Sequence, residues 1–179
     1  NIHGTFYEVP FWIVGQAPIY TKMRPVSTHN KQISDFTTWN GLLVLAGTKS
    51  RSTPSARIFK SPDEETALWF GGIDELWKFG KPVGVGGPWN NTLVKAGASS
   101  DPYLMTGYDK KTLILESDKN CSITAEIDID HWSGFHSYKT FDLEAGKKIT
   151  FKFPIGFAAH WVRFKSSVEV KASAQLIYQ

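Results

Sequence analysis

A histidine, an arginine and an aspartate close together in the first part of the chain are the first residues suited to chemistry. His29 has Arg24 upstream and Asp35 downstream. An imidazole can act as general base or general acid near neutral pH. A guanidinium can neutralise the uronate or sulfate group of an acidic sugar. We therefore take His29 as a candidate catalytic residue and Arg24 as a candidate substrate-binding residue; the alternative is a surface loop.

Two adjacent acidic residues, Asp74 and Glu75, lie in a tryptophan-rich segment. Paired carboxylates supply the acid and the base of most glycosidases. Neighbouring residues on a strand point to opposite faces, so these two alone are a poor pair. One of them would need a carboxylate elsewhere, such as Asp35. This leaves Asp35 as a second catalytic candidate and Asp74 as a substrate-binding one, with a solvated turn as the alternative.

Tryptophans are the candidate platforms for a sugar ring, because the apolar C–H face of a sugar stacks on an indole. The alternative for each is core packing, the usual place of tryptophan in a β protein. The substrate-binding candidates of this kind are Trp39, Trp69, Trp77 and Trp89.

One cysteine and three later histidines invite comparison with a blue-copper site, which uses His, Cys and His ligands. Cys121 precedes His131, His136 and His160, however, and no methionine follows them closely. We therefore expect no metal. The chain also has no phosphate loop, nucleotide fingerprint or Gly-x-Ser-x-Gly motif, so we expect no cofactor and no serine hydrolase.

The composition is that of a globular chain with many aromatic residues. Of 179 residues, 41% are hydrophobic and 14% aromatic, which suits one ordinary domain or two small β units. The net charge of +3 comes from interspersed residues, so nothing indicates a nucleic acid partner. No apolar stretch approaches the roughly 20 residues of a membrane helix.

The first residues carry no initiator methionine and no signal peptide. Asn1 is followed at once by a strand-like run over residues 2–9. A natural start usually has a leader or a polar lead-in. We therefore expect a mature or cut end, which would belong to a processed protein, an expressed fragment or one piece of a nicked chain. We also expect a secreted or periplasmic setting.

Strand signals dominate the first part of the chain, and residues 61–68 support at most one short helical turn. Asn40-Gly41 between apolar runs predicts a hairpin that joins residues 32–38 to residues 42–46. Residues 11–14 and 75–79 read as further strands. The glycine- and proline-rich residues 80–88 read as an irregular connector.

The sequence pattern changes near residue 100, where an irregular segment rich in tryptophan and glycine ends. We therefore divide the chain into residues 1–99 and 100–179. Short strands separated by turn signals fill the second part, and this spacing indicates an antiparallel β-sandwich. The expected strands are residues 103–106, 112–115, 123–129, 139–142, 149–153, 160–164 and 168–178.

Two stretches of the first part together resemble the last blades of bacterial β-propellers found in secreted proteins of polysaccharide breakdown. Each combines a strand, a turn and a tryptophan-rich strand. The later part resembles the sandwich that closes such proteins. The stretches that carry the resemblance are His29–Phe36 with Trp39–Leu45, Leu68–Pro82 with Gly86–Trp89, and, for the sandwich, Asp101–Gly107 to Gly156–Arg163.

The resemblance implies an all-β fold in which propeller-blade-like strands precede the sandwich. It also implies glycoside hydrolase-like or polysaccharide lyase-like activity on a polysaccharide or oligosaccharide, with His29 facing a central channel. Two blades cannot close a ring of 4–8, so the rest of a larger propeller chain would be a partner. The alternatives are a non-catalytic carbohydrate-binding sandwich, or a structural domain that seals a propeller edge.

Overall fold

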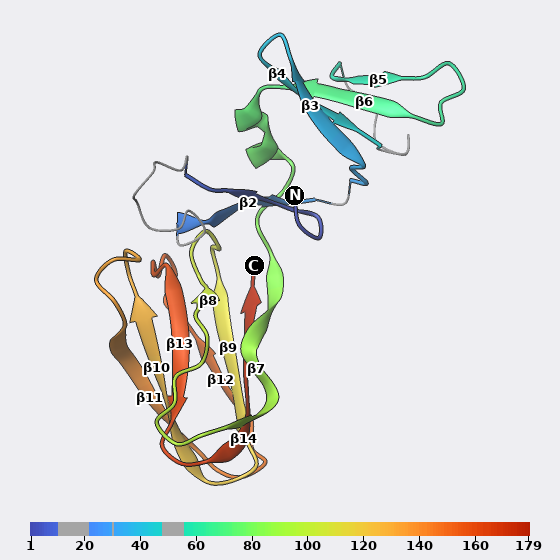
Figure 1. The fold of residues 1–179 in the computed structure, drawn as a ribbon. Coiled ribbons are helices and arrows are strands. Elements are labelled where there is room, and N and C mark those ends of the chain that lie inside the picture. Colours follow the sequence, from blue (N-terminus) through green and yellow to red (C-terminus); the bar gives the residue numbers. More distant parts are fainter. Residues whose placement is uncertain (11–21, 30, 48–55) are drawn as a thin grey trace. The chain divides into compact units, whose positions relative to one another are not determined.

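The computed structural model describes residues 1–10, 22–29, 31–47 and 56–179, and nearly all of their regular structure is β (Figure 1). The all-β fold class is confirmed. Contacts divide the chain into two units, which we describe separately. The N-terminal unit comprises Asn1–Tyr7 and Val26–Lys81, and the sandwich unit comprises Glu8–Pro25 and Pro82–Gln179. The strand predicted over residues 11–14 lies outside the described residues.

The main feature of the N-terminal unit is a four-stranded antiparallel sheet with the order β3-β4-β6-β5. Its strands are β3 (Asp35–Trp39), β4 (Leu42–Ala46), β5 (Ile58–Lys60) and β6 (Ala67–Gly71). A separate two-stranded sheet pairs β1 (Thr5–Glu8) with β2 (Arg24–Thr28).

The predicted Asn-Gly hairpin is confirmed. Asn40 and Gly41 have φ angles of 47° and 77°, the left-handed values that a tight two-residue turn requires. The turn brings Trp39 opposite Leu42 and starts the β3–β4 ladder. One face of this sheet then buries Leu43, Leu45 and Trp69 in a small core with Val26 and Leu76.

Residues 75–79 do not form the predicted strand. They lie in a 3-10 helix, η2 (Ile73–Lys78), with Asp74 and Glu75 in its first turn. The amide of Glu75 donates to the carbonyl of Gly72, and that of Phe79 donates to Leu76. Leu76 is the buried residue of the helix. One apolar anchor per turn suits a short helix better than the alternation of a strand.

The sandwich unit contains two four-stranded antiparallel sheets with the orders β11-β10-β13-β8 and β12-β9-β14-β7. Consecutive strands mostly alternate between the sheets, and β7 pairs with β14. This is the strand order of a jelly roll. The strands are β7 (Gly84–Val94), β8 (Tyr103–Leu104), β9 (Lys111–Ser117), β10 (Cys121–Asp128), β11 (His136–Leu143), β12 (Ile149–Lys152), β13 (Trp161–Ser166) and β14 (Val170–Tyr178).

Strand β7 begins inside the glycine-rich segment that we predicted to be irregular, and it lies before residue 100 although it belongs to the sandwich. Its glycines permit a very close approach to β14. A Cβ atom on Gly87 would lie 1.9 Å from the carbonyl oxygen of Ala174. The β7–β14 register shifts on both sides of Ala174. Glycine is therefore needed at position 87 because β14 lies too close for a Cβ atom, and not because the segment forms a loop.

Apolar side chains fill the space between the two sheets. Along β9 the burial alternates with period two, and every second residue from Lys111 to Ser117 faces inward. Phe164, Leu113, Leu115 and Leu176 are fully buried. Because this interior is packed, a ligand site has to be sought on the surface or at an end of the sandwich.

The strand order of the N-terminal unit corrects the propeller prediction. A blade formed as an up-and-down meander would have the order β3-β4-β5-β6, but β5 lies at the edge beyond β6. The second stretch that carried the resemblance forms no second blade. It contributes β6 to the same sheet, continues as helix η2 and enters the sandwich as β7.

Candidate functional site

His29, the predicted catalytic base, is packed among aromatic side chains. Its ring centroid lies 4.9 Å from that of Phe6 and 6.1 Å from that of Phe79. Its Nδ1 accepts a hydrogen bond from the amide of Lys31 at 3.1 Å. Burial is the main cause that lowers the pKa of His29, and the charge of Lys31 adds to it. These contacts describe a partly buried packing residue of the N-terminal unit.

The predicted polar partners lie at exposed positions. Arg24 forms an ion pair with Glu8. Asp35 begins β3, and its Oδ1 accepts a hydrogen bond from the amide of Phe36 at 2.8 Å. Asp74 lies in the first turn of η2, while its neighbour Glu75 pairs with Arg57 at 2.5 Å. None of these contacts links a predicted carboxylate to His29.

The four predicted tryptophan platforms divide into two kinds. Trp69 and Trp89 are 5% and 4% exposed and belong to the cores of the two units. Trp39 and Trp77 are 59% and 47% exposed. Trp39 packs edge to face against Phe70 at 6.1 Å. Only Trp39 and Trp77 of this set therefore present an indole to solvent.

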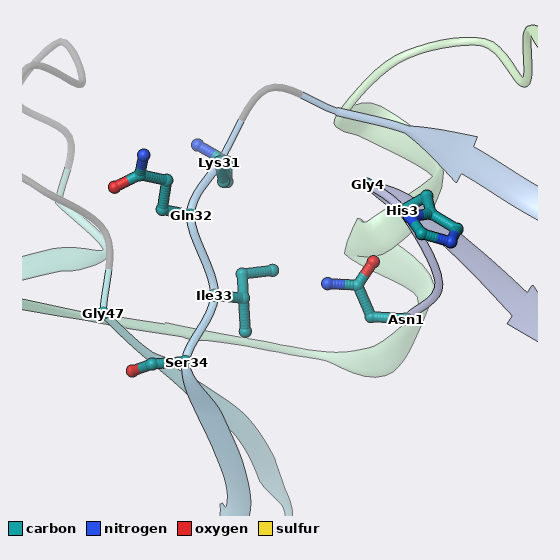
Figure 2. A pocket seen from close by; sticks show the side chains of 8 residues that line it. All are labelled: Asn1, His3, Gly4, Lys31, Gln32, Ile33, Ser34 and Gly47. Atoms are coloured by element: carbon teal, nitrogen blue, oxygen red, sulfur yellow. The ribbon is translucent and has the colours of Figure 1, made fainter.

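A hollow of about 520 Å³ lies in the N-terminal unit beside the first residues of the chain (Figure 2). Its lining includes Asn1, His3, Lys31, Gln32 and Ser34. Asn30 and residues 48–55 adjoin this lining in the sequence and lie outside the described residues, so we build no site on it.

The sandwich unit offers a better site where three loops gather at one end. They are the β8–β9 loop (105–110), the β10–β11 loop (129–135) and the β12–β13 loop (153–160). The antiparallel ladders bring all three to the same end, at the top of the sandwich in Figure 1.

Four aromatic rings form a continuous row, three of them from two of these loops and the fourth from the first residue of β13. Successive ring centroids lie 5.3 Å apart from Trp132 to His131, 5.4 Å from His131 to His160 and 5.4 Å from His160 to Trp161. We call Trp132, His131, His160 and Trp161 the ring row.

Pairing of β10 with β13 positions the ring row, because it places Asp128 opposite Trp161. The amide of His160 donates to the carbonyl oxygen of Asp128 at 2.8 Å. The amide of His131 donates to the Asp128 carboxylate, also at 2.8 Å. Both imidazoles are thus held by the last residue of β10.

The carboxylate of Asp130 holds the backbone beneath Trp132. Its Oδ1 accepts the amides of Trp132 and Ser133 at 2.9 and 2.7 Å, and its Oδ2 accepts the Ser133 hydroxyl at 2.7 Å. Hydrogen bonds from the hydroxyl and amide of Ser133 are the main causes that lower the pKa of Asp130. The Trp132 indole remains 63% exposed, with the Lys22 ammonium 5.3 Å from its ring centroid.

The two imidazoles of the ring row keep hydrogen-bonding capacity. The Nε2 atoms of His131 and His160 are buried and have no hydrogen-bond partner among the described residues. Burial, aided by the nearby His131, lowers the pKa of His160, while a hydrogen bond to the Met23 backbone opposes this. A ligand hydroxyl that reaches either Nε2 would satisfy a group that is otherwise costly to bury.

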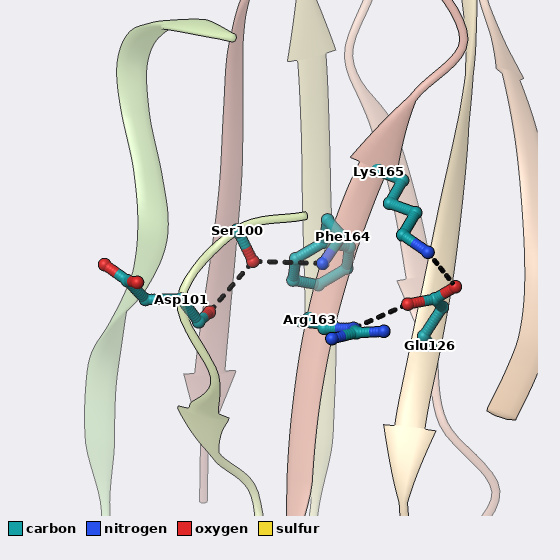
Figure 3. Close-up of polar contacts among 6 residues, drawn as sticks. All are labelled: Ser100, Asp101, Glu126, Arg163, Phe164 and Lys165. Carbon is teal, nitrogen blue, oxygen red and sulfur yellow. Dashed lines mark hydrogen bonds and ion pairs between the residues drawn. The ribbon is translucent and has the colours of Figure 1, made fainter. Parts of the chain in front are cut away.

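On the outer face of the β10–β13 pair, Glu126 lies opposite Arg163, two residues along the ladder from the Asp128–Trp161 pair (Figure 3). The carboxylate of Glu126 accepts hydrogen bonds from Arg163 Nε at 2.6 Å and from Lys165 Nζ at 2.8 Å. The Arg163 guanidinium carbon lies 4.2 Å from the centroid of Phe135. These side chains are fixed by one another, so this face is a rigid polar surface.

The β8–β9 loop and the β12–β13 loop together form a separate hollow of about 500 Å³. Its lining runs over residues 106–111 and 155–158. Lys111 belongs to this lining although it is only 6% exposed. Its Nζ donates to the carbonyl oxygens of Tyr108 at 2.6 Å and Phe157 at 2.9 Å, one from each loop.

Cys121 does not share a site with the histidines. It begins β10, whereas His131 follows the end of that eight-residue strand, about 25 Å away at the rise of a β-strand. In the part of the chain that the structure describes, no group of three or more His, Cys, Asp or Glu side chains is arranged to hold a metal ion.

The sequence carried a signal for Trp132, which stands beside Ser133-Gly134, because an indole inside a turn has no core to enter. Lys111 precedes the strand predicted over residues 112–115. Its burial follows the period-two alternation of burial along β9, which Ile114 between Leu113 and Leu115 hides in the sequence.

Comparison with known proteins assigns no family to this chain. No family model matches it, and no curated protein matches it. A solved structure, that of dTDP-4-dehydrorhamnose 3,5-epimerase from Sulfolobus tokodaii, is 14% identical over 80% of this chain and 72% of that chain, with a TM-score of 0.27. So low a TM-score transfers neither fold nor activity to this chain.

The predicted membership among propeller proteins of polysaccharide breakdown is wrong, and so is the glycoside hydrolase-like function drawn from it. The strand order of the β3–β6 sheet rules out the blade on which that prediction rested. The solved structure reported above is that of a sugar epimerase, and the comparisons give no support for a propeller or a hydrolase. The secreted or periplasmic setting stays a prediction.

Among the described residues, no helix combines the length and apolar character that crossing a membrane would require.

Proposed function

We propose that the sandwich unit is a non-catalytic carbohydrate-binding module whose ligand stacks on Trp132. The single observation that carries the proposal is the state of this side chain: its backbone is fixed by Asp130, yet its indole is 63% exposed. Exposing so large an apolar ring costs solvation free energy, which a stacked sugar face recovers. A loop backbone that is already fixed also loses little conformational entropy on binding.

The surroundings of Trp132 suit a sugar. Lys22 supplies an ammonium beside the ring, and the exposed residues Asp130 and Ser133 supply further polar groups. Sugars combine an apolar C–H face with a rim of hydroxyls, so an aromatic platform bordered by such groups is complementary to them.

The carboxylates near the ring row support binding rather than hydrolysis. A glycosidase needs one carboxylic acid that stays protonated, which requires a raised pKa. Hydrogen bonds lower the pKa of Asp130 instead. Asp128 is buried and accepts the amide of His131. Both residues thus act as loop anchors.

Affinity electrophoresis tests the proposal, with the full chain run through gels that contain xylan, β-glucan, pectate, alginate or chondroitin sulfate. We expect at least one polysaccharide to retard the chain. Trp132→Ala should weaken that retardation about tenfold or more, whereas Trp132→Phe should keep most of it.

Leu93→Ala is the matched control, because Leu93 is 68% exposed on β7, outside the three loops. This variant should migrate as the unmodified chain does. No retardation in any of the gels, or retardation that survives Trp132→Ala, would overturn the proposal.

A further inference from the structure

We propose that the hollow at Lys111 is a subsite for a carboxylate, so that the sugar recognised by this module is a uronic acid. The inference rests on the proposed carbohydrate-binding function and names its ligand class. It depends on three features of the sandwich unit: a buried ammonium, the hydrogen bonds that this ammonium makes, and the hollow that it lines.

The charge of Lys111 is buried without a counter-ion. Its residue is 6% exposed, and within the described residues it forms no ion pair. Burial is the main cause that lowers the pKa of Lys111, and the charge of Asp109 only partly opposes this. A buried ammonium whose hydrogen bonds go to neutral carbonyl oxygens is costly, and an anion that enters the hollow would offset the part of that cost that Asp109 leaves.

The hydrogen bonds of Lys111 leave one donor for a ligand. An ammonium has three N–H groups, and two of them are used by the Tyr108 and Phe157 carbonyl oxygens. Nothing among the described residues accepts the third. The two carbonyls also hold Nζ in place, because they come from the two loops that form the hollow.

The rest of the lining suits a sugar ring that carries the carboxylate. Tyr108 stacks on Tyr178 with centroids 4.1 Å apart, which makes its position rigid. Ile155 and Phe157 add apolar surface, and Ile155 is almost fully exposed. A uronic acid presents one apolar ring face and one carboxylate, which matches this combination of surfaces.

The β12–β13 loop connects the hollow to the ring row. It contributes residues 155–158 to the lining of the hollow, and it ends at His160 of the ring row. One oligosaccharide that lies along this loop can therefore offer a ring to Trp132 and a carboxylate to Lys111.

The test compares trigalacturonate with its methyl ester, two probes that differ only in the charge of the carboxyl groups. Binding to the full chain is followed by calorimetry and by the amide resonances of Gly107 and Gly156, which line the hollow. We expect trigalacturonate to bind at least about tenfold more tightly and to shift both resonances.

The variants are Lys111→Met and Lys95→Met, which change the net charge equally. Lys95 is exposed and lies outside the lining of the hollow. We expect Lys111→Met to abolish the preference for the free acid and Lys95→Met to preserve it. Because Lys111→Met removes a link between loops, its folding is checked by comparing its amide spectrum with that of the unmodified chain.

The outcomes separate the two proposals. Equal affinity for the acid and the ester, with both lost in Trp132→Ala, would overturn the uronate inference and leave the carbohydrate-binding function intact. Equal effects of the two lysine variants would also overturn it, since they would show that overall surface charge, and not Lys111, determines the preference for the free acid. Unchanged Gly107 and Gly156 resonances on binding would place the carboxylate elsewhere. Failure of both probes and of every polysaccharide would remove the proposed function itself.

Discussion

The imidazoles of His131 and His160 lie edge to face, with ring centroids 5.4 Å apart and an interplanar angle of 62°. They come from different loops and meet because β10 and β13 are neighbours in one sheet. Each has a buried Nε2 without a partner in the described part of the chain. Burial, aided by the nearby His131, lowers the pKa of His160, so the fold favours the neutral form of the His160 ring.

The first prediction concerns the pH dependence of stability. The pKa of His160 is lowered from its ordinary value of 6.5, so the unfolded chain gains a proton before the folded chain does as the pH falls. The contribution of His160 is present above about pH 6.5 and is lost as the pH falls toward the lowered folded value. Urea unfolding at about pH 7.5 and pH 5.5 should show His160→Gln losing less stability on acidification, by on the order of 1 kcal/mol.

His29 has a pKa lowered in the same direction, so it contributes a parallel loss from the N-terminal unit. The comparison must therefore be made on variants of one residue at a time. His136→Gln serves as the control, since His136 is an exposed strand residue. A His160→Gln variant with the same loss on acidification as the unmodified chain would contradict the prediction.

The second prediction concerns the carboxylate that joins two cations on the outer face of the sandwich. Glu126→Gln should lower the free energy of unfolding by about 1–3 kcal/mol, because it leaves Arg163 and Lys165 without their shared anion. Although burial alone would raise the pKa of Glu126, hydrogen bonds from Lys165 and Arg163 lower it. The stabilisation should therefore be lost only as the pH falls through that lowered value.

A double-mutant cycle between Glu126→Gln and Arg163→Met checks this prediction by denaturant unfolding at neutral pH. Glu116→Gln is the control, because its pair with Lys148 is exposed and long at 3.6 Å. Additive effects of the two changes would show that the contact contributes no coupling free energy.

The third prediction concerns the contact between the first and last strands of the sandwich. Gly87→Ala should destabilise the unit by several kcal/mol, on the order of the larger effects seen for single substitutions, because its Cβ would overlap the Ala174 carbonyl. Gly84→Ala on the same strand should cost about 1 kcal/mol or less, since its Cβ would meet only side-chain atoms at 3.8 Å and 3.9 Å. Thermal unfolding of the two variants measures the difference, and equal melting temperatures would refute the close approach.

Local patterns in the sequence predicted the strands and turns where one residue pair decides the geometry. The Asn40-Gly41 pair predicted the hairpin, and the strand predicted over residues 149–153 matches β12. The same reasoning failed where contacts between residues distant in the sequence determine the local structure. Gly86 and Gly87 read as a connector because only the neighbouring strand β14 makes glycine necessary in β7. We predicted a strand over residues 75–79 because the sequence pattern does not show that Leu76 is the buried residue of this segment.

The candidate site was harder to predict than the fold, because chemistry-bearing residue types say little about position. His29 has the right side chain but packs between Phe6 and Phe79. Trp69 and Trp89 have the right rings but fill the cores. Trp132 and Lys111 become candidates only once the topology brings three loops to one end of the sandwich and assigns each residue its exposure.

The pairing of β7 with β14 has a consequence for how the sandwich assembles. Among the described strands, β7 pairs with β14 alone. The earliest strand of the jelly roll can therefore complete its ladder only after the latest one has been synthesised. Strand β14 also lies between β9 and β7, which makes it the last central strand to arrive. Such non-local closure predicts slow folding and a nucleus that includes the C-terminal strand. Until it forms, the exposed edges of β7 and β9 are the places where two growing chains would associate wrongly.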